Sequence, residues 1–483
     1  LAEVRTTSAK AISSLTAIMS DEFLQTVTDW VFHTLRRSST SAEKAGAAQV
    51  LAEVISARGE SVLSINFATI QAGMEDAVAN VREGFLHLMI YAPSTIPQAI
   101  FQNFLPLAFP WVLRGLSDLN ERVRTVALTA GSGIIGLYGT RNLALVLTPL
   151  LEGVISEVGN LRHSSMLLAS KLLIHLVNQI KKKLRMETAE NEAAEGEAQP
   201  EEDAEAEDTT LAQAGEIRVE TARDAEKRGV SILGALEEQI GHENFIRILA
   251  AMHIGRSEHN LNVRTDCTTA WQICVASPRA AMTKIFSAII TMLIKFASSD
   301  NAECVDVAEQ SIEYTCARLN ENVERFVDRF SEQYQEGHLR HRIGALTCLA
   351  CVVQFADSQR LMKMGGQIVA CVMPGMQDED ESVRNCAGLL FERVSKVVGS
   401  RLIESVVETQ LSTSIRGVVE VVKVRPSVAL AVIFKNLHGR STYTLHDVDL
   451  ISSVLDVEQA EEDLPRFFDK ICDILLVAIG QNI

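Results

Sequence analysis

The sequence contains few aromatic residues and no long apolar run. The lack of a long apolar run argues against a transmembrane helix. Aromatic side chains make up only 5% of the 483 residues. The best apolar stretch, 288–297, is short and contains Lys295, whereas a transmembrane helix needs about 18 or more apolar residues. We therefore expect no membrane insertion.

The residue patterns of common enzymes are also missing. No Ser-His-Asp arrangement, Walker loop or pair of carboxylates stands out along the chain. The nine cysteines are odd in number and lie mostly on apolar helical stretches, which indicates free thiols that act as small hydrophobes in a reducing compartment. We expect no enzyme, no cofactor, no metal and no small-molecule substrate.

Lysine and arginine are absent from residues 187–208, where eleven residues are acidic. Such a segment cannot bury enough apolar surface to offset the cost of ordering the chain. We expect 187–210 to be a disordered acidic loop that interrupts one helical array, formed by 1–186 and 211–483. Because the segment supplies eleven of the charges behind a formal net charge of -17, the rest of the chain is only mildly acidic.

A helical segment recurs 260 residues further along the chain. Each copy has an acidic N-cap candidate, an amphipathic stripe and a glycine where a helix would end. The matched positions are Asp118, Val123, Arg124, Ala127, Ile134, Leu137 and Gly139 in the first copy, and Asp378, Val383, Arg384, Ala387, Val394, Val397 and Gly399 in the second.

Basic residues mark the equivalent position in other repeats. They are Arg82, Arg124, Arg162, Arg264, Arg342 and Arg384, preceded by Lys10 and Lys44, with Asp306 fitting less well. Their period of about 40 residues is typical of HEAT and armadillo arrays. The gap from Arg162 to Arg264 fits two such units plus a surplus of roughly 22 to 26 residues. We predict an all-α, α-α superhelix (a HEAT/armadillo-type solenoid) of about ten to eleven helix pairs. The six arginines should bond the neighbouring turn or carboxylates such as Asp118 and Asp378, and so hold the repeats in register.

Three local motifs match known sites, but a helical context argues against each. Residues 131–136 have dinucleotide-binding spacing but lie within a helical stripe, where small residues for close packing explain them better. Residues 365–367 match the Gly-Gly-Gln tripeptide of peptide-release factors, and we expect a turn between two helices there. Zinc-ligand types occur at His338, His341, Cys348 and Cys351, yet one helix would spread them over roughly 20 Å.

Two basic clusters are the candidate contacts for RNA or a partner. Arg36 and Arg37 end one expected helix, and Lys181, Lys182, Lys183 and Arg185 directly precede the acidic segment. Cations at helix C-termini are favoured by the helix dipole, which alone explains both clusters. Alternatively they bind RNA phosphates with salt-dependent affinity, although they lack the interleaved aromatics of single-strand binders. The acidic segment could then fold over the lysines and mask them.

Several stretches resemble the giant HEAT-repeat activator of general amino-acid control, a translational regulator needed by the kinase that phosphorylates initiation factor two. The similarity runs weakly from about residue 8 to 439. The stretches are 46–54, 123–131 with Tyr138, and 161–165, followed after the acidic segment by 255–257, 263–264, Trp271 and 277–279.

This resemblance implies a cytoplasmic, ribosome-associated scaffold without catalytic activity, which supports activation of the initiation factor 2-alpha kinase. Its implied partners are the ribosome, including the ribosomal RNA backbone, the stress kinase and the ribosome-associated ATPase of the family. By position, the chain resembles the part of that regulator that follows its section similar to elongation factor three. This part precedes most of the kinase-docking section. The family's kinase-docking arginine has no counterpart here. Because the sequence begins at Leu1 inside a repeat, we expect a fragment.

A nuclear-transport receptor or phosphatase-type scaffold is the alternative interpretation. These proteins are helical-repeat arrays too, and transport receptors can carry an acidic loop. Karyopherins bind cargo through acidic and aromatic inner surfaces, whereas only Trp30, Trp111 and Trp271 are available here.

Overall fold

The computed structural model describes residues 2–196, 232–318, 322–398, 406–408, 410–411, 414–438, 440–460 and 463–481. Across these ranges the chain forms helices joined by turns, with no strand, so the all-α prediction is confirmed. The chain divides into two compact units, Leu1–Phe286 and Ser287–Ile483, which are described separately.

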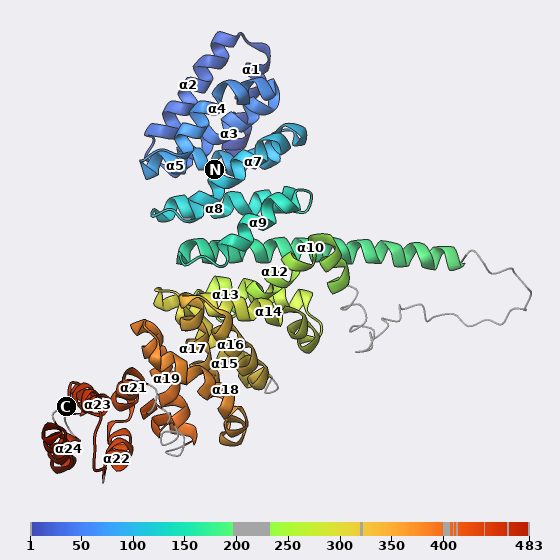
Figure 1. Cartoon of the computed structure of the whole chain (residues 1–483). Helices are drawn as coiled ribbons and strands as arrows, with labels where there is room; N and C mark the ends of the chain where they lie inside the picture. Colours follow the sequence, from blue (N-terminus) through green and yellow to red (C-terminus); the bar gives the residue numbers. More distant parts are fainter. Residues whose placement is uncertain are drawn as a thin grey trace, which may run out of the picture. The chain divides into compact units, whose positions relative to one another are not determined.

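The first unit consists of paired helices in two layers (Figure 1). Its elements are α1 (Ala2–Ile18), α2 (Asp21–Arg37), α3 (Ser41–Arg58), α4 (Glu60–Met74), α5 (Ala79–Leu86), α6 (Leu88–Thr95), α7 (Gln98–Leu116), α8 (Glu121–Ile134), the π-helix η1 (Ile135–Gly139), α9 (Leu143–Gly153), α10 (Gly159–Gly196), a helix over 232–240, α12 (His242–Gly255) and α13 (Leu261–Cys274). One layer packs in the order α1, α3, α5 with α6, α8, α10 and α13, and α7, α9 and α12 belong to the other.

The second unit repeats this arrangement. Its elements are α15 (Ala302–Arg318), α16 (Asn322–Glu336), α17 (Leu339–Val353), α18 (Ser358–Gln377), α19 (Glu381–Val398), α21 (Ile415–Val424), α22 (Pro426–Leu437), α23 (Leu445–Leu455), the short 3-10 helices η2 (Glu458–Ala460) and η3 (Leu464–Arg466), and α24 (Phe468–Gly480). Helices α15, α17, α19, α21 and α23 pack in succession, and α16 lies against α18.

The boundary between the units falls within α14 (Pro278–Ala297). This helix is long and apolar enough to cross a membrane, although the sequence contains no uncharged run of that length. However, 67% of its most apolar window is buried inside the protein, as in the core helix of a soluble repeat protein. All nine cysteines are free, as predicted, and most of them are buried.

The predicted acidic loop, 187–210, lies only partly within the described residues. Helix α10 continues through 187–196, so the first part of the expected loop is helical. Alanine and glutamate are among the better helix formers, and here this propensity outweighs the effect of charge. The remainder of the predicted loop, 197–210, lies outside the described residues.

The interval from Arg162 to Arg264 is one step of the array, and the prediction of two units was wrong. Helices α10 and α13 pack directly against each other. Arg162 on α10 donates a 2.8 Å hydrogen bond to Glu258, in the turn that leads into α13. The sequence spacing was misleading because the layer passes directly from α10 to α13.

The predicted helix ends in the two similar segments also need correction. The N-cap of α8 is Asn120 and not Asp118, and Asp380, not Asp378, accepts hydrogen bonds from the first amides of α19. Gly139 is the last residue of η1, and the only described glycines with positive φ are Gly59 and Gly241. The second expected end glycine, at position 399, lies outside the described residues.

Glycines recur where the two helices of a pair approach each other. In each case a Cβ atom would lie less than 3.0 Å from a side chain twelve positions later. The pairs are Gly73 with Phe85, Gly115 with Ala127, Gly153 with Ser165, Gly255 with Cys267 and Gly375 with Ala387. Within the glycine-rich stretch 131–136, close packing is confirmed at Gly131, against Leu168, whereas Gly133 faces open space.

Candidate functional site

The predicted stacking arginines lie at a repeated set of contacts between neighbouring helix pairs. Arg82 Nη1 donates to the backbone oxygens of Asp76 and Ala77 at 2.7 and 2.8 Å. Its Nε and Nη2 donate to the carboxylate of Asp118 at 2.7 and 2.9 Å, 36 residues further along the chain. One guanidinium therefore joins the turn that precedes its own helix to the same turn of the next pair.

Asp118 connects two successive arginines. While its side chain accepts from Arg82, its backbone oxygen accepts from Arg124 Nη1 at 2.8 Å. Burial alone would raise the pKa of Asp118, but the hydrogen bonds from Arg82 and the Asn120 amide, together with the charges of Arg82 and Arg124, outweigh this effect and the pKa lies below its ordinary value. The Arg82–Asp118 hydrogen bond in turn raises the pKa of Arg82. Both groups are therefore held as ions by each other.

The second unit contains the same contacts. Arg342 pairs with the carboxylate of Asp378, whose backbone oxygen accepts from Arg384 at 2.9 Å. Arg384 Nε also lies 3.4 Å from Glu420. We call this repeated set of basic residues and their partners the arginine ladder.

Two members of the arginine ladder are fully buried. Lys44 donates to Asn80 at 2.5 Å and to Glu83 at 2.8 Å, and Arg162 pairs with Glu258. The backbone oxygen of Glu258 accepts from Arg264 at 3.3 Å, so the ladder continues across the 96 residues that separate Arg162 from Glu258.

Sequence reasoning missed the partners Glu83, Glu258 and Glu420. A usable pattern exists for Glu258, because Asp76, Asp118, Glu258 and Asp378 all stand six positions before a ladder arginine. At that offset, Asp118, Glu258 and Asp378 each accept from the ladder arginine of the preceding repeat.

The Arg36–Arg37 cluster lies at an open groove beside the end of α2. The two arginines are exposed, and Arg36 lies 5.8 Å from the centre of the Phe85 ring. The groove has a volume of about 450 Å³ and contains one acidic residue, Asp29; its other lining residues are Gln25, Phe32, His33, Arg36, Arg37, Asn66 and Thr69. Both arginines fall in the last helical turn, where the helix dipole favours them.

The lysine cluster has a different setting from the one predicted. It lies inside α10, which continues to Gly196, so the helix-dipole explanation does not apply to it. Lys182, Lys183 and Arg185 are exposed, whereas Lys181 is half-buried near Cys274. Helices α8 and α9 lie between α2 and α10 in Figure 1, and the two basic clusters are therefore not brought together.

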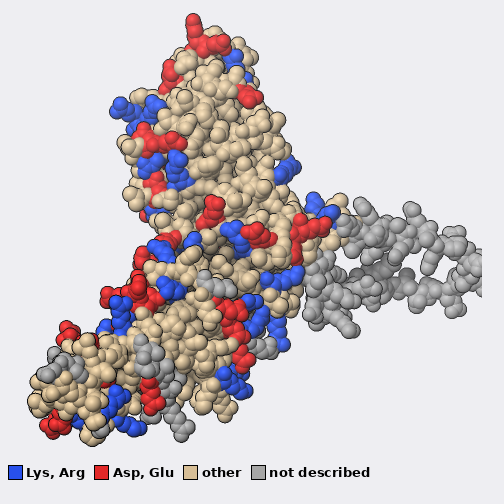
Figure 2. Space-filling view, in the orientation of Figure 1, with Lys and Arg blue, Asp and Glu red and all other residues tan. Residues whose placement is uncertain are grey.

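On the face drawn in Figure 2, the described charged residues do not separate into areas of one sign. In Figure 2, Lys and Arg side chains are intermingled with Asp and Glu over the visible surface. Trp111 and Trp271 are buried, and only Trp30, at 51% exposure, offers a large aromatic surface among the tryptophans. Arg256 covers the Trp271 ring at 5.1 Å from its centre.

The zinc-type residues lie along α17 and its start. His338 directly precedes the helix, and Cys348 is fully buried. Burial raises the pKa of Cys348 well above its ordinary value, and burial followed by the nearby carboxylate of Glu309 raises that of Cys351 to about 12. A metal-binding thiolate is disfavoured at both positions.

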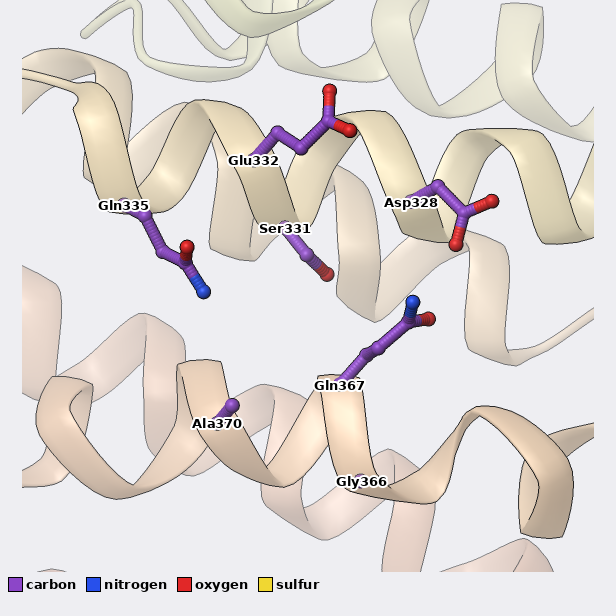
Figure 3. Close-up of a pocket in the computed structure, with 7 residues that line it drawn as sticks. All are labelled: Asp328, Ser331, Glu332, Gln335, Gly366, Gln367 and Ala370. Atoms are coloured by element: carbon purple, nitrogen blue, oxygen red, sulfur yellow. The ribbon is translucent and has the colours of Figure 1, made fainter.

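The Gly-Gly-Gln tripeptide is helical, and the prediction of a turn was wrong. Residues 365–367 lie in the middle of α18, where Gly366 and Gln367 line a cleft of about 550 Å³ against α16 (Figure 3). A turn was expected because glycine pairs favour turns, but the apolar side chains on both sides of the pair bury one face of α18 and keep the helix continuous. The α16 side of the cleft is formed by Asp328, Ser331, Glu332 and Gln335, and Ala370 completes the α18 side.

Comparison with known proteins identifies relatives that align with most of this chain at low sequence identity. The chain is 26% identical over 407 residues to the human "Stalled ribosome sensor GCN1", covering 84% of the chain and 14% of that protein. It is similar to a segment of GCN1. The yeast (Saccharomyces cerevisiae) "eIF-2-alpha kinase activator GCN1" is 25% identical over 404 residues, covering 83% of the chain and 14% of that protein.

The similarity to GCN1 confirms the resemblance predicted from the residues. The Arabidopsis thaliana "Protein ILITYHIA" is 27% identical over 321 residues, which cover 66% of the chain and 11% of that protein. The chain spans about a seventh of the length of the GCN1 proteins it matches. No protein-family model matches it.

Solved structures resemble the chain only weakly. A karyopherin bound to a SUMO protease has a TM-score of 0.28 and 14% identity, covering 95% of the chain and 46% of the karyopherin. A tubulin-recruiting array of TOG domains has a TM-score of 0.26 and 14% identity, covering 85% and 95% of the two chains. The assignment of the helical-repeat fold therefore rests on the helix pairs described above.

Proposed function

We propose that this chain is a segment of a non-catalytic scaffold in translational stress control, which binds ribosomes in the cytoplasm and supports activation of the initiation factor 2-alpha kinase. The observation that carries the proposal is the 26% identity over 84% of the chain to a protein named as a stalled ribosome sensor. The yeast relative is named as an activator of that kinase. The kinase and the ribosome-associated ATPase are proposed as partners of the whole protein.

The basic side chains inside the repeats and those on the surface support two different roles. The ladder arginines and Lys44 are engaged with carboxylates and backbone oxygens inside the repeats, so they stabilise stacking rather than bind a partner. Contact with ribosomal RNA phosphates is left to exposed basic residues, of which the Arg36–Arg37 groove and the α10 cluster are the candidates. Binding energy would be distributed over many weak, salt-sensitive contacts.

Reversing the charge of Arg36 and Arg37 together should weaken ribosome binding about tenfold or more at low salt, because the variant neutralises fewer phosphates and releases fewer counterions on binding. The measurement is co-sedimentation of the chain with ribosomes over a salt series. The salt dependence of the affinity should also become shallower, by about one unit of slope for each phosphate that the variant no longer neutralises.

The matched control for the Arg36→Glu/Arg37→Glu variant is Arg122→Glu/Lys435→Glu, which changes net charge equally at exposed sites outside both clusters. The control should bind almost as well as the parent chain. Equal weakening in the two variants would show that only net charge matters, and sedimentation that is absent at low salt even for the parent chain would contradict ribosome binding.

Removing negative charge next to the α10 cluster should strengthen RNA binding at low salt, if the acidic residues mask the lysines. Since α10 extends to Gly196, a deletion from position 187 would shorten the helix as well. We therefore choose Glu→Gln and Asp→Asn changes confined to 197–208, which preserve length. Filter binding to a short RNA duplex measures the affinity, and an unchanged salt slope would rule out masking.

A further inference from the structure

Two stretches of the first unit that pack against each other lack acidic residues. None occurs between Glu121, at the start of α8, and Glu152 in α9, and none occurs between Glu157 and Glu187 along α10. The same two stretches contain nine lysines and arginines. Because the whole chain has a net charge of -17, this is a strong local excess of positive charge.

Four basic side chains lie on one face of α10. Lys171, His175, Lys182 and Arg185 follow one another at spacings of four, seven and three residues, which places them on the same side of a helix. Lys171 is half-buried and the other three are exposed. At 1.5 Å per residue the row extends over roughly 21 Å. We call this row the α10 basic ridge.

The α10 basic ridge borders α8 and η1. Lys171 Nζ donates to Ser132 Oγ at 2.9 Å, and a Cβ atom on Gly136 would lie 3.8 Å from His175 Nε2. Since the partner of Lys171 is a neutral hydroxyl, the ammonium charge is not compensated there. Neither Lys171 nor Lys182 has an ion pair within the described part of the chain. These charges therefore differ from those of the ladder arginines, which carboxylates neutralise.

A glycine leaves the helix backbone open beside the ridge. Gly133 follows Ser132, and it stands in the interior of α8, where glycine weakens a helix relative to alanine. Its φ is not positive, and a Cβ atom there would meet nothing within 4 Å. Neither backbone conformation nor internal packing requires glycine at this position, whereas close approach of a ligand to the helix backbone would.

The two stretches offer no exposed aromatic ring. Tyr138 is their only aromatic residue. It is 4% exposed, and its hydroxyl donates to the backbone oxygen of Pro93. Proteins that bind single strands stack bases on exposed aromatic side chains, whereas double-stranded RNA is recognised mostly by its shape and its backbone. The ridge has the residues for the second kind of contact.

We propose that the α10 basic ridge binds the phosphate backbone of double-stranded RNA without reading its sequence. Along the helix its cations stand roughly 5 to 10 Å apart, a spacing that suits neighbouring phosphates of a duplex. The backbone of one strand would pass over Gly133 and lie against Lys171 and Lys182. This inference rests on the proposed ribosome binding and names base-paired RNA as the partner of α10.

The test is fluorescence anisotropy of the whole chain with a fluorescein-labelled RNA duplex of about 16 base pairs, over a salt series. The parent chain should bind the duplex more tightly than either separated strand, and equally well when the sequence is scrambled. Lys171→Gln/Lys182→Gln/Arg185→Gln should weaken duplex binding about tenfold or more at low salt. The salt slope should become shallower by about two to three units, about one for each phosphate contact that is lost.

A second variant tests the ridge without removing any of its side chains. Gly133→Glu adds a negative charge in open space next to Ser132, so it should weaken duplex binding more than the neutral Gly133→Gln of the same size. Both substitutions should leave the melting temperature unchanged or higher, because glutamate and glutamine favour a helix more than glycine does. Equal affinity of the two variants would contradict a phosphate contact at this position.

The matched control for the triple variant is Arg122→Gln/Lys363→Gln/Lys435→Gln, which removes the same charge from exposed positions outside the ridge. It should bind the duplex like the parent chain. The proposal is overturned by equal weakening in the two triple variants, by a parent chain that does not bind the duplex, or by separated strands that bind as tightly. Tighter binding of a polyglutamate peptide than of the duplex would also overturn it and assign the ridge to an acidic protein.

Co-sedimentation of the parent chain with ribosomes, measured in parallel, separates this inference from the proposed function. A chain that sediments with ribosomes but does not bind the duplex contradicts the inference alone. A chain that binds the duplex through the ridge but does not sediment with ribosomes contradicts the proposed function and leaves the RNA site established.

Discussion

Replacing Glu258 with glutamine should lower the free energy of unfolding of the first unit by about 3 to 5 kcal/mol, the usual cost of breaking a buried ion pair. The side chains of Arg162 and Glu258 are both fully buried and lie 2.8 Å apart, and His163 Nε2 lies 3.1 Å from the other carboxylate oxygen. Glutamine preserves the size of the side chain but removes its charge. The guanidinium of Arg162 then remains in the interior without its counter-charge, which costs more than the missing hydrogen bond itself.

The double variant Arg162→Met/Glu258→Leu should recover most of that stability, because an apolar pair of similar volume can replace a buried ion pair. Urea denaturation gives the free energies for a double-mutant cycle. Hydrogen exchange should show reduced protection centred on α10 and α13 in the single variant. A double variant as unstable as Glu258→Gln, or a single variant that is destabilised by less than about 1 kcal/mol, would show that the pair does not hold these helices together.

Acidification should remove the difference between the parent and Glu258→Gln. Burial alone would raise the pKa of Glu258, but hydrogen bonds from His163 and Arg162 outweigh it and hold the pKa below its ordinary value. A carboxylate whose pKa is lower in the folded state stabilises the fold fully above its unfolded pKa of about 4.3, and loses that contribution as pH falls through the folded pKa. The parent should therefore lose stability over this range while the variant changes less.

Helical period is enough to find the ladder arginines but not all their partners. Arg82, Arg124 and Arg162 recur at nearly equal intervals, and such periodicity reflects stacking of like units. Glu258 is 96 residues from Arg162, so its spacing from Arg162 does not reveal the pair, although its offset of six from Arg264 marks it as a candidate; packing of α10 on α13 brings the two together. Asp118 was expected to cap α8 because acidic residues before helices often do so; Asn120 takes that role, and Asp118 is thereby available to Arg82.

Composition misleads where two physical effects oppose each other. Residues 187–196 are acidic enough to predict disorder, yet they continue a long helix, since propagation needs no new nucleus. The α16–α18 cleft could not be predicted from the sequence, for a different reason. Asp328 and Gln367 stand on separate helices, so no spacing rule joins them, and in the sequence the glycines at 365–366 stand out only as part of a turn-like tripeptide.

Replacing Gly84 with alanine should destabilise the first unit by about 3 kcal/mol, at the upper end of the usual cost of overpacking. Gly84 is buried in α5, and a Cβ atom there would lie less than 3.0 Å from the backbone oxygen of Leu35 in α2. Helix propensity alone would make this substitution stabilising by about 0.5 to 1 kcal/mol. Steric overlap should reverse the sign, because a backbone oxygen inside a packed helix cannot rotate away as a side chain can.

The equivalent glycine of the second unit provides an independent repeat of the experiment. Gly344 stands two positions after Arg342, as Gly84 does after Arg82, and a Cβ atom there would overlap the backbone oxygen of Ile294. Gly365→Ala is the matched control, since its Cβ meets nothing within 4 Å and should raise stability by about 0.5 to 1 kcal/mol. Thermal and urea unfolding would measure all three variants. Stabilisation by alanine at both Gly84 and Gly344 would mean that helices of neighbouring pairs are further apart than the structure places them, and that helix propensity alone decides the residue at this position.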